Sequence, residues 1–139
     1  MQLIPINQYH EETNNVKIDL VNESIYLSKQ LLTLHSPYFA SMLKSDDYME
    51  GRTGVINLDD VDFSWEFSAL LHRIYGFNIP CADFRLDELK LMLSLADRFQ
   101  LRIMVEEIED YWLSQPIENQ KELSEEAERH DMKLLLSRN

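Results

Sequence analysis

Ser36 and Pro37 stand between two short apolar runs, and this pair constrains the fold more than any other feature of the sequence. Proline disfavours helical geometry at the residue before it and is favoured at the first position of a helix. Ser28 is suited to cap the first of the two helices. The apolar residues fall at helical spacing on both sides of the pair: Leu31, Leu32 and Leu34 before it, and Phe39, Met42 and Leu43 after it. The sequence therefore predicts two short helices that form a corner at Ser36-Pro37.

Residues 16–27 have the pattern of a β-hairpin. Val16, Ile18 and Leu20 alternate with polar residues, and Asn22-Glu23 suits the turn before a second strand at residues 25–27. The run Val55 to Leu58 predicts a third strand after a polar, acidic segment. We expect three short strands.

Three later segments have apolar residues at helical spacing. Residues 63–75 form the first, which Asp59, Asp60 or Asp62 is expected to cap and Gly76 to end. Residues 87–99 form the second. The third precedes Pro116. Four of its apolar residues are expected to point inward, namely Val105, Ile108, Tyr111 and Trp112. Four acidic residues are expected to point largely outward, namely Glu106, Glu107, Glu109 and Asp110.

The tail at residues 118–138 repeats the amphipathic pattern more weakly. Its apolar positions are Leu123, Ala127, Met132, Leu135 and Leu136. We expect a helical hairpin with a break near His130-Asp131.

This order of elements predicts an α+β fold: a small three-stranded sheet capped by a cluster of helices, with a C-terminal helical extension. A chain of 139 residues is one domain long. We expect an N-terminal segment at residues 1–14, the domain at residues 15–114, and the extension at residues 115–139.

Charge and composition narrow the classes of partner. The formal net charge of −12 repels phosphate backbones and anionic membrane surfaces, so we expect neither nucleic acid nor membrane as a partner. No apolar run approaches the ~20 residues that cross a bilayer. The single cysteine, Cys81, cannot form an internal disulfide, which favours an intracellular protein of the cytoplasm or nucleus.

The sequence offers no constellation for catalysis, so we expect an interaction protein rather than an enzyme. The four histidines, His10, His35, His72 and His130, are far apart and show no metal-ligand spacing. Three glycines cannot form a phosphate-cradling loop, and Asp59, Asp60 and Asp62 lack the glycine and the distal Glu of a calcium loop. We therefore expect no cofactor and no metal.

The order of the elements and the residues in four blocks resemble the BTB domain, also called the POZ domain. The blocks are the hairpin from Val16 to Leu27, LSKQLLTLHSPYFASML from Leu27, VINLDDVDFSWEFSALLHRIYG from Val55, and LKLMLSLADRFQLRIMVEEIEDYWL from Leu89. SPYF after a leucine-rich helix and the later LADRFQL are the specific pieces. The resemblance covers residues 15–113, and the tail resembles the helical extension that follows BTB domains in cullin adaptors.

The resemblance is closest to the BTB portion of MATH-BTB type proteins, which implies an adaptor for a cullin-RING ubiquitin ligase. In such adaptors the BTB domain binds the cullin scaffold, and a second region recruits the substrate. The family's cullin-binding feature is a hydrophobic residue, any residue and Glu in the loop after the SPYF helix, and Tyr48, Met49 and Glu50 occupy that place. An aromatic anchor beside a carboxylate suits an interface hot spot. In the alternative interpretation, Tyr48 or Met49 folds back onto the core.

Two other functions of the same fold stay open. The domain could be a self-associating or heterotypic scaffold without a ligase role, whose partner is a second copy or another BTB domain. A Skp-like adaptor that binds an F-box helix is a third interpretation, against which the SPYF block argues.

Two features depart from the family pattern near its dimer interface. Residues 1–15 contain a proline and little helical periodicity, so the family's N-terminal dimerisation helix is not predicted there. Asn15 stands where the family usually has Asp, and Ser28-Lys29 stands where His-Lys is frequent.

Overall fold

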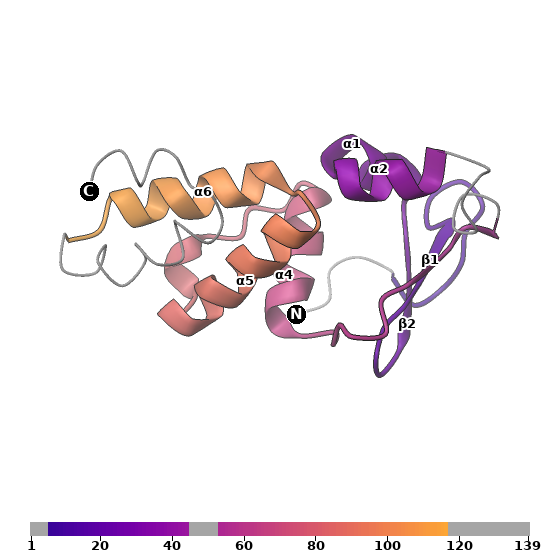
Figure 1. Cartoon of the computed structure of the whole chain (residues 1–139), viewed down its shortest axis with the longest axis horizontal. Coiled ribbons are helices and arrows are strands. Elements are labelled where there is room, and N and C mark those ends of the chain that lie inside the picture. Colours follow the sequence, from indigo (N-terminus) through magenta and orange to yellow (C-terminus); the bar gives the residue numbers. More distant parts are fainter. Residues whose placement is uncertain (1–5, 45–52, 117–139) are drawn as a thin grey trace. The chain divides into compact units, whose positions relative to one another are not determined.

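A computed structural model describes residues 6–44 and 53–116 of the chain (Figure 1). The elements follow the order β1, β2, α1, α2, β3, α4, η1, α5 and α6, where η1 is a 3-10 helix. The chain divides into two compact units, which join in the sequence between Asn78 and Ile79. The described part of the first unit holds the strands with α1, α2 and α4, and that of the second holds η1, α5 and α6. The predicted α+β fold with a small three-stranded sheet is confirmed.

The sheet has the order β2-β1-β3. Strands β1 (Val16–Asp19) and β2 (Ser24–Leu27) form the predicted antiparallel hairpin, in which Asp19 pairs with Ser24. The Ser24 hydroxyl donates to Asp19 Oδ1 at 2.7 Å and so closes the turn. Strand β3 (Val55–Asn57) runs parallel to β1, a pairing that puts Ile56 opposite Ile18 in the buried layer.

The predicted corner is confirmed. Helix α1 (Lys29–His35) begins where Ser28 Oγ accepts a hydrogen bond from the Leu31 amide at 3.2 Å. Ser36 is extended and buried, its amide donates to the Leu32 carbonyl, and its hydroxyl oxygen accepts from the Phe39 amide at 3.1 Å. The same residue therefore ends α1 and caps α2 (Pro37–Lys44), and the two helices pack against each other (Figure 1).

Helix α4 (Trp65–Ile74) begins at a different cap from the one predicted. Ser64 Oγ accepts from the Phe67 amide at 3.2 Å, so the helix is capped by Ser64 and not by Asp59, Asp60 or Asp62. The serine lies immediately before the first helical residue, whereas those aspartates end too early to reach the first turn. Gly76 ends the helix as predicted, with φ +95° and the Phe77 amide bonded back to the His72 carbonyl.

In the second unit, η1 (Cys81–Asp83) precedes α5 (Leu86–Arg98) and α6 (Arg102–Leu113), and α5 packs against α6. Gln100 makes the left-handed turn between them with φ 57°. The predicted inward residues Val105, Ile108 and Trp112 are buried, and Tyr111 is partly so. Glu109 corrects the prediction of an outward acidic face, because it is only 3% exposed. Helical geometry puts it between Val105, four residues before, and Trp112, three residues after, on the buried side.

Candidate protein-interaction surfaces

The predicted contact residues Tyr48, Met49 and Glu50 lie outside the described residues. The structure does describe the elements from which their segment departs and to which it returns. On one side, α2 ends at Lys44 directly after the buried Leu43. On the other side, the Gly54 carbonyl accepts a hydrogen bond from the Lys17 amide at 2.9 Å, which extends the β1-β3 ladder.

The outer face of the sheet carries a shallow groove of about 320 Å³. Lys17 on β1 pairs with Tyr26 on β2 and Val55 on β3, so the three side chains emerge on one face. The Tyr9 ring packs edge-on against that of Tyr26, with 6.3 Å between the ring centroids. Thr53 and Gly54, the first residues described after the predicted contact residues in the sequence, also line the groove.

A hydrogen-bond network connects the residues before β1 to the start of α1. Asn15 Oδ1 accepts from the Lys29 amide at 3.0 Å, and its side-chain amide donates to the Glu11 carbonyl. The Tyr75 hydroxyl oxygen accepts from the Ser28 amide at 2.8 Å, and the hydroxyl donates to Asn14 Oδ1 at 3.4 Å. Burial raises the pKa of Tyr75, which keeps its phenol neutral as a donor.

This network gives a structural role to both positions that depart from the family pattern. Asn15 and the Ser28-Lys29 pair form local hydrogen bonds that position the N-terminal segment and the first turn of α1. The amide of Asn15 both accepts and donates, which an ionised Asp cannot do. Sequence reasoning missed the role of Tyr75, because its partner lies 47 residues away and no local pattern connects them.

Leu34 corrects the sequence prediction for α1. It was expected on the apolar side with Leu31 and Leu32, but 74% of it is exposed. Leu32 is buried, and two residues further along a helix is a rotation of about 200°, so Leu34 faces nearly the opposite way. Single exposed leucines are common on protein surfaces, so this exposure does not by itself mark a contact.

Cys81 is not prepared for nucleophilic chemistry. Burial, with a smaller contribution from the nearby Glu107 carboxylate, raises the pKa of the thiol to about 11. The thiol is therefore protonated at neutral pH, and its Sγ contacts the Glu107 carbonyl oxygen at 3.9 Å. A protonated, partly buried thiol is a poor nucleophile.

The histidines that the structure describes do not form a site. His72 is buried and its Nδ1 lies 2.7 Å from the carbonyl oxygen of Ser68 in the preceding turn of α4. His10 Nδ1 accepts from the Glu12 amide in an exposed turn, and His130 lies outside the described residues. Among residues 6–44 and 53–116, no group of three or more His, Cys, Asp or Glu could hold a metal ion.

Over the same described ranges, no helix combines the length and apolar character that a membrane crossing requires.

Comparison with known families gives a match. The model of the BTB/POZ domain matches residues 6–116, which include every strand and helix described above. Comparison with curated proteins gives no match.

Proposed function

From the premise that this chain belongs to the BTB/POZ family, whose domains mediate protein–protein interaction, we propose that it is an adaptor that binds the cullin scaffold of a cullin-RING ubiquitin ligase. The proposal keeps the division predicted from the sequence, with the domain at residues 15–114 and a helical extension after it. It also assigns the chain to the cytoplasm or nucleus, where such ligases act.

The observation that carries this proposal is the place of Tyr48, Met49 and Glu50 in a BTB chain. They fall between the end of α2 at Lys44 and the start of β3 at Val55. By the resemblance given above, the loop after the SPYF helix is where cullin adaptors of this family carry their cullin-binding residues. In the proposed complex Tyr48 enters an apolar pocket of the cullin, and Glu50 pairs with a cation at its rim. The central residue Met49 contributes apolar contact area.

The test is cullin binding by the double variant Tyr48→Ala/Glu50→Ala. Loss of a hot-spot residue costs about 2 kcal/mol or more, so we expect the Kd for purified cullin N-terminal domains to rise at least about thirtyfold. The matched control is Leu91→Ala, which removes an exposed apolar side chain from α5, outside the sheet groove, and is expected to bind as the parent does. Unchanged binding by the double variant would contradict the proposed contact.

A second candidate function is a self-associating or heterotypic BTB scaffold with no ligase role. Leu34 on α1 is a position where this can be tested, because an exposed leucine gains free energy if a partner covers it. We expect Leu34→Glu to shift the mass measured by light scattering toward the monomer if this surface associates. If the parent chain forms assemblies and binds no cullin, the result supports the scaffold against the adaptor.

A further inference from the structure

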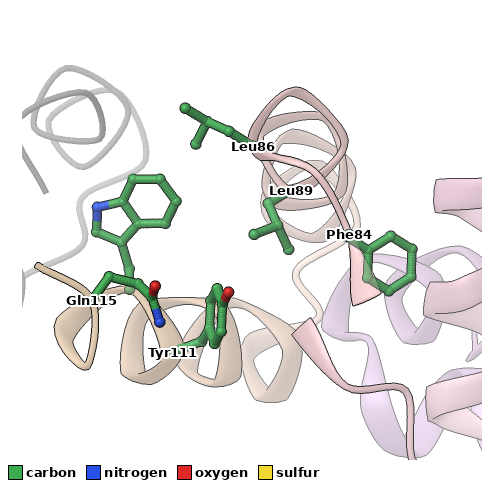
Figure 2. Close-up of a pocket in the computed structure, with 6 residues that line it drawn as sticks. Phe84, Leu86, Leu89, Tyr111 and Gln115 are labelled. Atoms are coloured by element: carbon green, nitrogen blue, oxygen red, sulfur yellow. The ribbon is translucent and has the colours of Figure 1, made fainter. Parts of the chain in front are cut away.

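A cavity of about 220 Å³ lies between the beginning of α5 and the end of α6 (Figure 2). Its walls are Phe84, Leu86, Leu89, Tyr111, Trp112 and Gln115, so five of its six residues are apolar or aromatic. Figure 2 shows Leu86 and Leu89 on α5, with Tyr111 and Gln115 on the α6 side. A cavity of about 150 Å³ with such walls can hold a benzene molecule. This larger one therefore has room for one or two aliphatic side chains.

Trp112 adds a large buried ring to the walls of the cavity. Its side chain is only 4% exposed, and among the described residues its buried indole Nε1 has no hydrogen-bond partner. A water molecule fits in the cavity but does not reach this nitrogen, so the nitrogen is not open to the cavity. An occupant is therefore expected to pack apolar side chains against the ring.

The chain's own continuation begins at the edge of this cavity. Gln115 lines the cavity, and the chain passes through Pro116 into residues 117–139, which lie outside the described residues. The strongest apolar run of that tail is MKLLL, from Met132 to Leu136. The intervening residues 116–131 are enough to let the chain turn back once, at a small cost in loop-closure entropy. A tethered segment also has a high effective concentration at a site beside its tether.

Net charge also favours docking of the part of the tail that contains the Met132–Leu136 run. Residues 79–116 carry eight Asp and Glu against four Lys and Arg, a net charge of −4. Residues 129–138, which contain the apolar run, carry three Lys and Arg against one Asp, a net charge of +2. Residues 117–128 carry five Glu against one Lys, a net charge of −4, which has the same sign as that of residues 79–116 and therefore does not favour their docking there.

We propose that the cavity between α5 and α6 is the docking site for residues 129–138 of the same chain. One or two side chains of the Met132–Leu136 run enter the cavity, and Arg129, Lys133 and Arg138 lie toward the acidic surface of the second unit. The site is independent of cullin binding: it can be present in a chain that binds no cullin, and absent from one that does.

The first test uses Trp112 as a reporter in the full chain with the other tryptophan removed by Trp65→Phe. In this background, Leu135→Asp is expected to raise the acrylamide quenching constant of Trp112 at least about twofold and to shift its emission to longer wavelength, because water reaches the vacated cavity. The matched control is Leu123→Asp, the same chemical change in the acidic half of the tail, which is expected to match the parent. Unchanged quenching in Leu135→Asp overturns the proposal, and so does an equal effect of Leu123→Asp.

The second test avoids any destabilising substitution. A photoreactive leucine analogue at position 135 of the full chain is irradiated in a one-to-one mixture of light and isotopically heavy chains, and the cross-linked peptides are identified by mass spectrometry. We expect cross-links to residues 84–89 or 111–115, as light–light and heavy–heavy pairs only. Light–heavy pairs would assign the cavity to the tail of a second copy, and cross-links confined to other residues would place the tail elsewhere. Either result overturns the proposal, whatever the outcome of the cullin assay.

Discussion

The α1 region of the first unit, from Ser28 to Ser36, and the α6 end of the second unit differ in how they satisfy their buried polar groups. At the start of α1, the Tyr75 hydroxyl both accepts from the Ser28 amide and donates to Asn14, and at the end of α1 the buried Ser36 caps α2. At the α6 end, the Trp112 indole has no acceptor among the described residues, and its ring lies beside a cavity. Both regions contain a large aromatic residue with one polar atom, but only the first has a partner for that atom within the described residues.

This difference separates a region whose own residues satisfy its polar groups from one with an open, largely apolar cavity. The α1 region is specified by contacts that leave no buried polar group of the network without a partner, as in most native structures. The apolar residues around the cavity at the α6 end gain free energy when an occupant covers them. A protein-binding domain needs surfaces of the second kind, because free energy gained on closing a cavity is available for binding.

The largest expected effect tests whether the first unit is closely packed. Leu70 on α4 is fully buried, so Leu70→Ala is expected to lower the free energy of unfolding by about 3 kcal/mol, through lost burial and the cavity that remains. Leu34→Ala makes the same chemical change at an exposed position and is expected to cost less than about 0.5 kcal/mol. Urea unfolding measures both. Equal losses would mean that Leu34 is covered in solution, which would favour the self-associating scaffold.

The second prediction removes the partnered polar atom from the start of α1. Tyr75→Phe leaves the Ser28 amide without its acceptor, so we expect a loss of about 1–2 kcal/mol in the free energy of unfolding. Tyr26→Phe removes a hydroxyl from the partly exposed sheet face and is the matched control, expected within about 0.5 kcal/mol of the parent. Thermal unfolding with a common baseline measures both. A neutral Tyr75→Phe would remove the distinction between the two regions.

Much of the first unit could be predicted from the sequence, because its signals are local. The hairpin, the Ser28 cap, the Ser36-Pro37 corner and the Gly76 stop each depend on residues within a few positions of one another. Leu34 was placed wrongly because the three leucines were assigned to one face of the helix. Leu34 follows Leu32 by two residues, a rotation of about 200°, so the two side chains cannot lie on the same face. Glu109 was placed wrongly because its charge was given more weight than its position between two buried neighbours.

Long-range features could not be predicted from one sequence. Neither the bond from Tyr75 to Ser28 nor the parallel pairing of β3 with β1 leaves a local pattern. The cavity beside Trp112 depends on how α5 and α6 pack, and the helical stripes only indicated that these residues are apolar. The contact assigned to Tyr48, Met49 and Glu50 stays a prediction, because these residues lie outside the described part of the chain.

The third prediction concerns pH and the second unit. The pKa of the Cys81 thiol is raised from its ordinary value to about 11, so the folded state binds this proton more tightly than the unfolded state. The associated stability is complete below the ordinary thiol pKa and is lost as the pH rises toward about 11. Because the thiol is only partly buried, solvent screening reduces the expected loss to about 1 kcal/mol. Cys81→Ala removes this component, so the parent should lose more stability than the variant between pH 8 and 11, by about 1 kcal/mol in urea titrations. Parallel curves would contradict the raised pKa.

The smallest expected effect decides whether the α6 end is completed by the chain's own tail. If Leu135 contacts Leu89 across the cavity, the losses from Leu89→Ala and Leu135→Ala will not add, and the double-mutant cycle should give a coupling of about 0.5–1 kcal/mol. The control cycle pairs Leu135→Ala with Leu70→Ala, whose losses are expected to add within about 0.3 kcal/mol, because Leu70 packs within the first unit. Additivity in both cycles would mean that Leu135 and Leu89 do not touch, and the contact with this wall would then have to come from another residue of the Met132–Leu136 run or from another molecule.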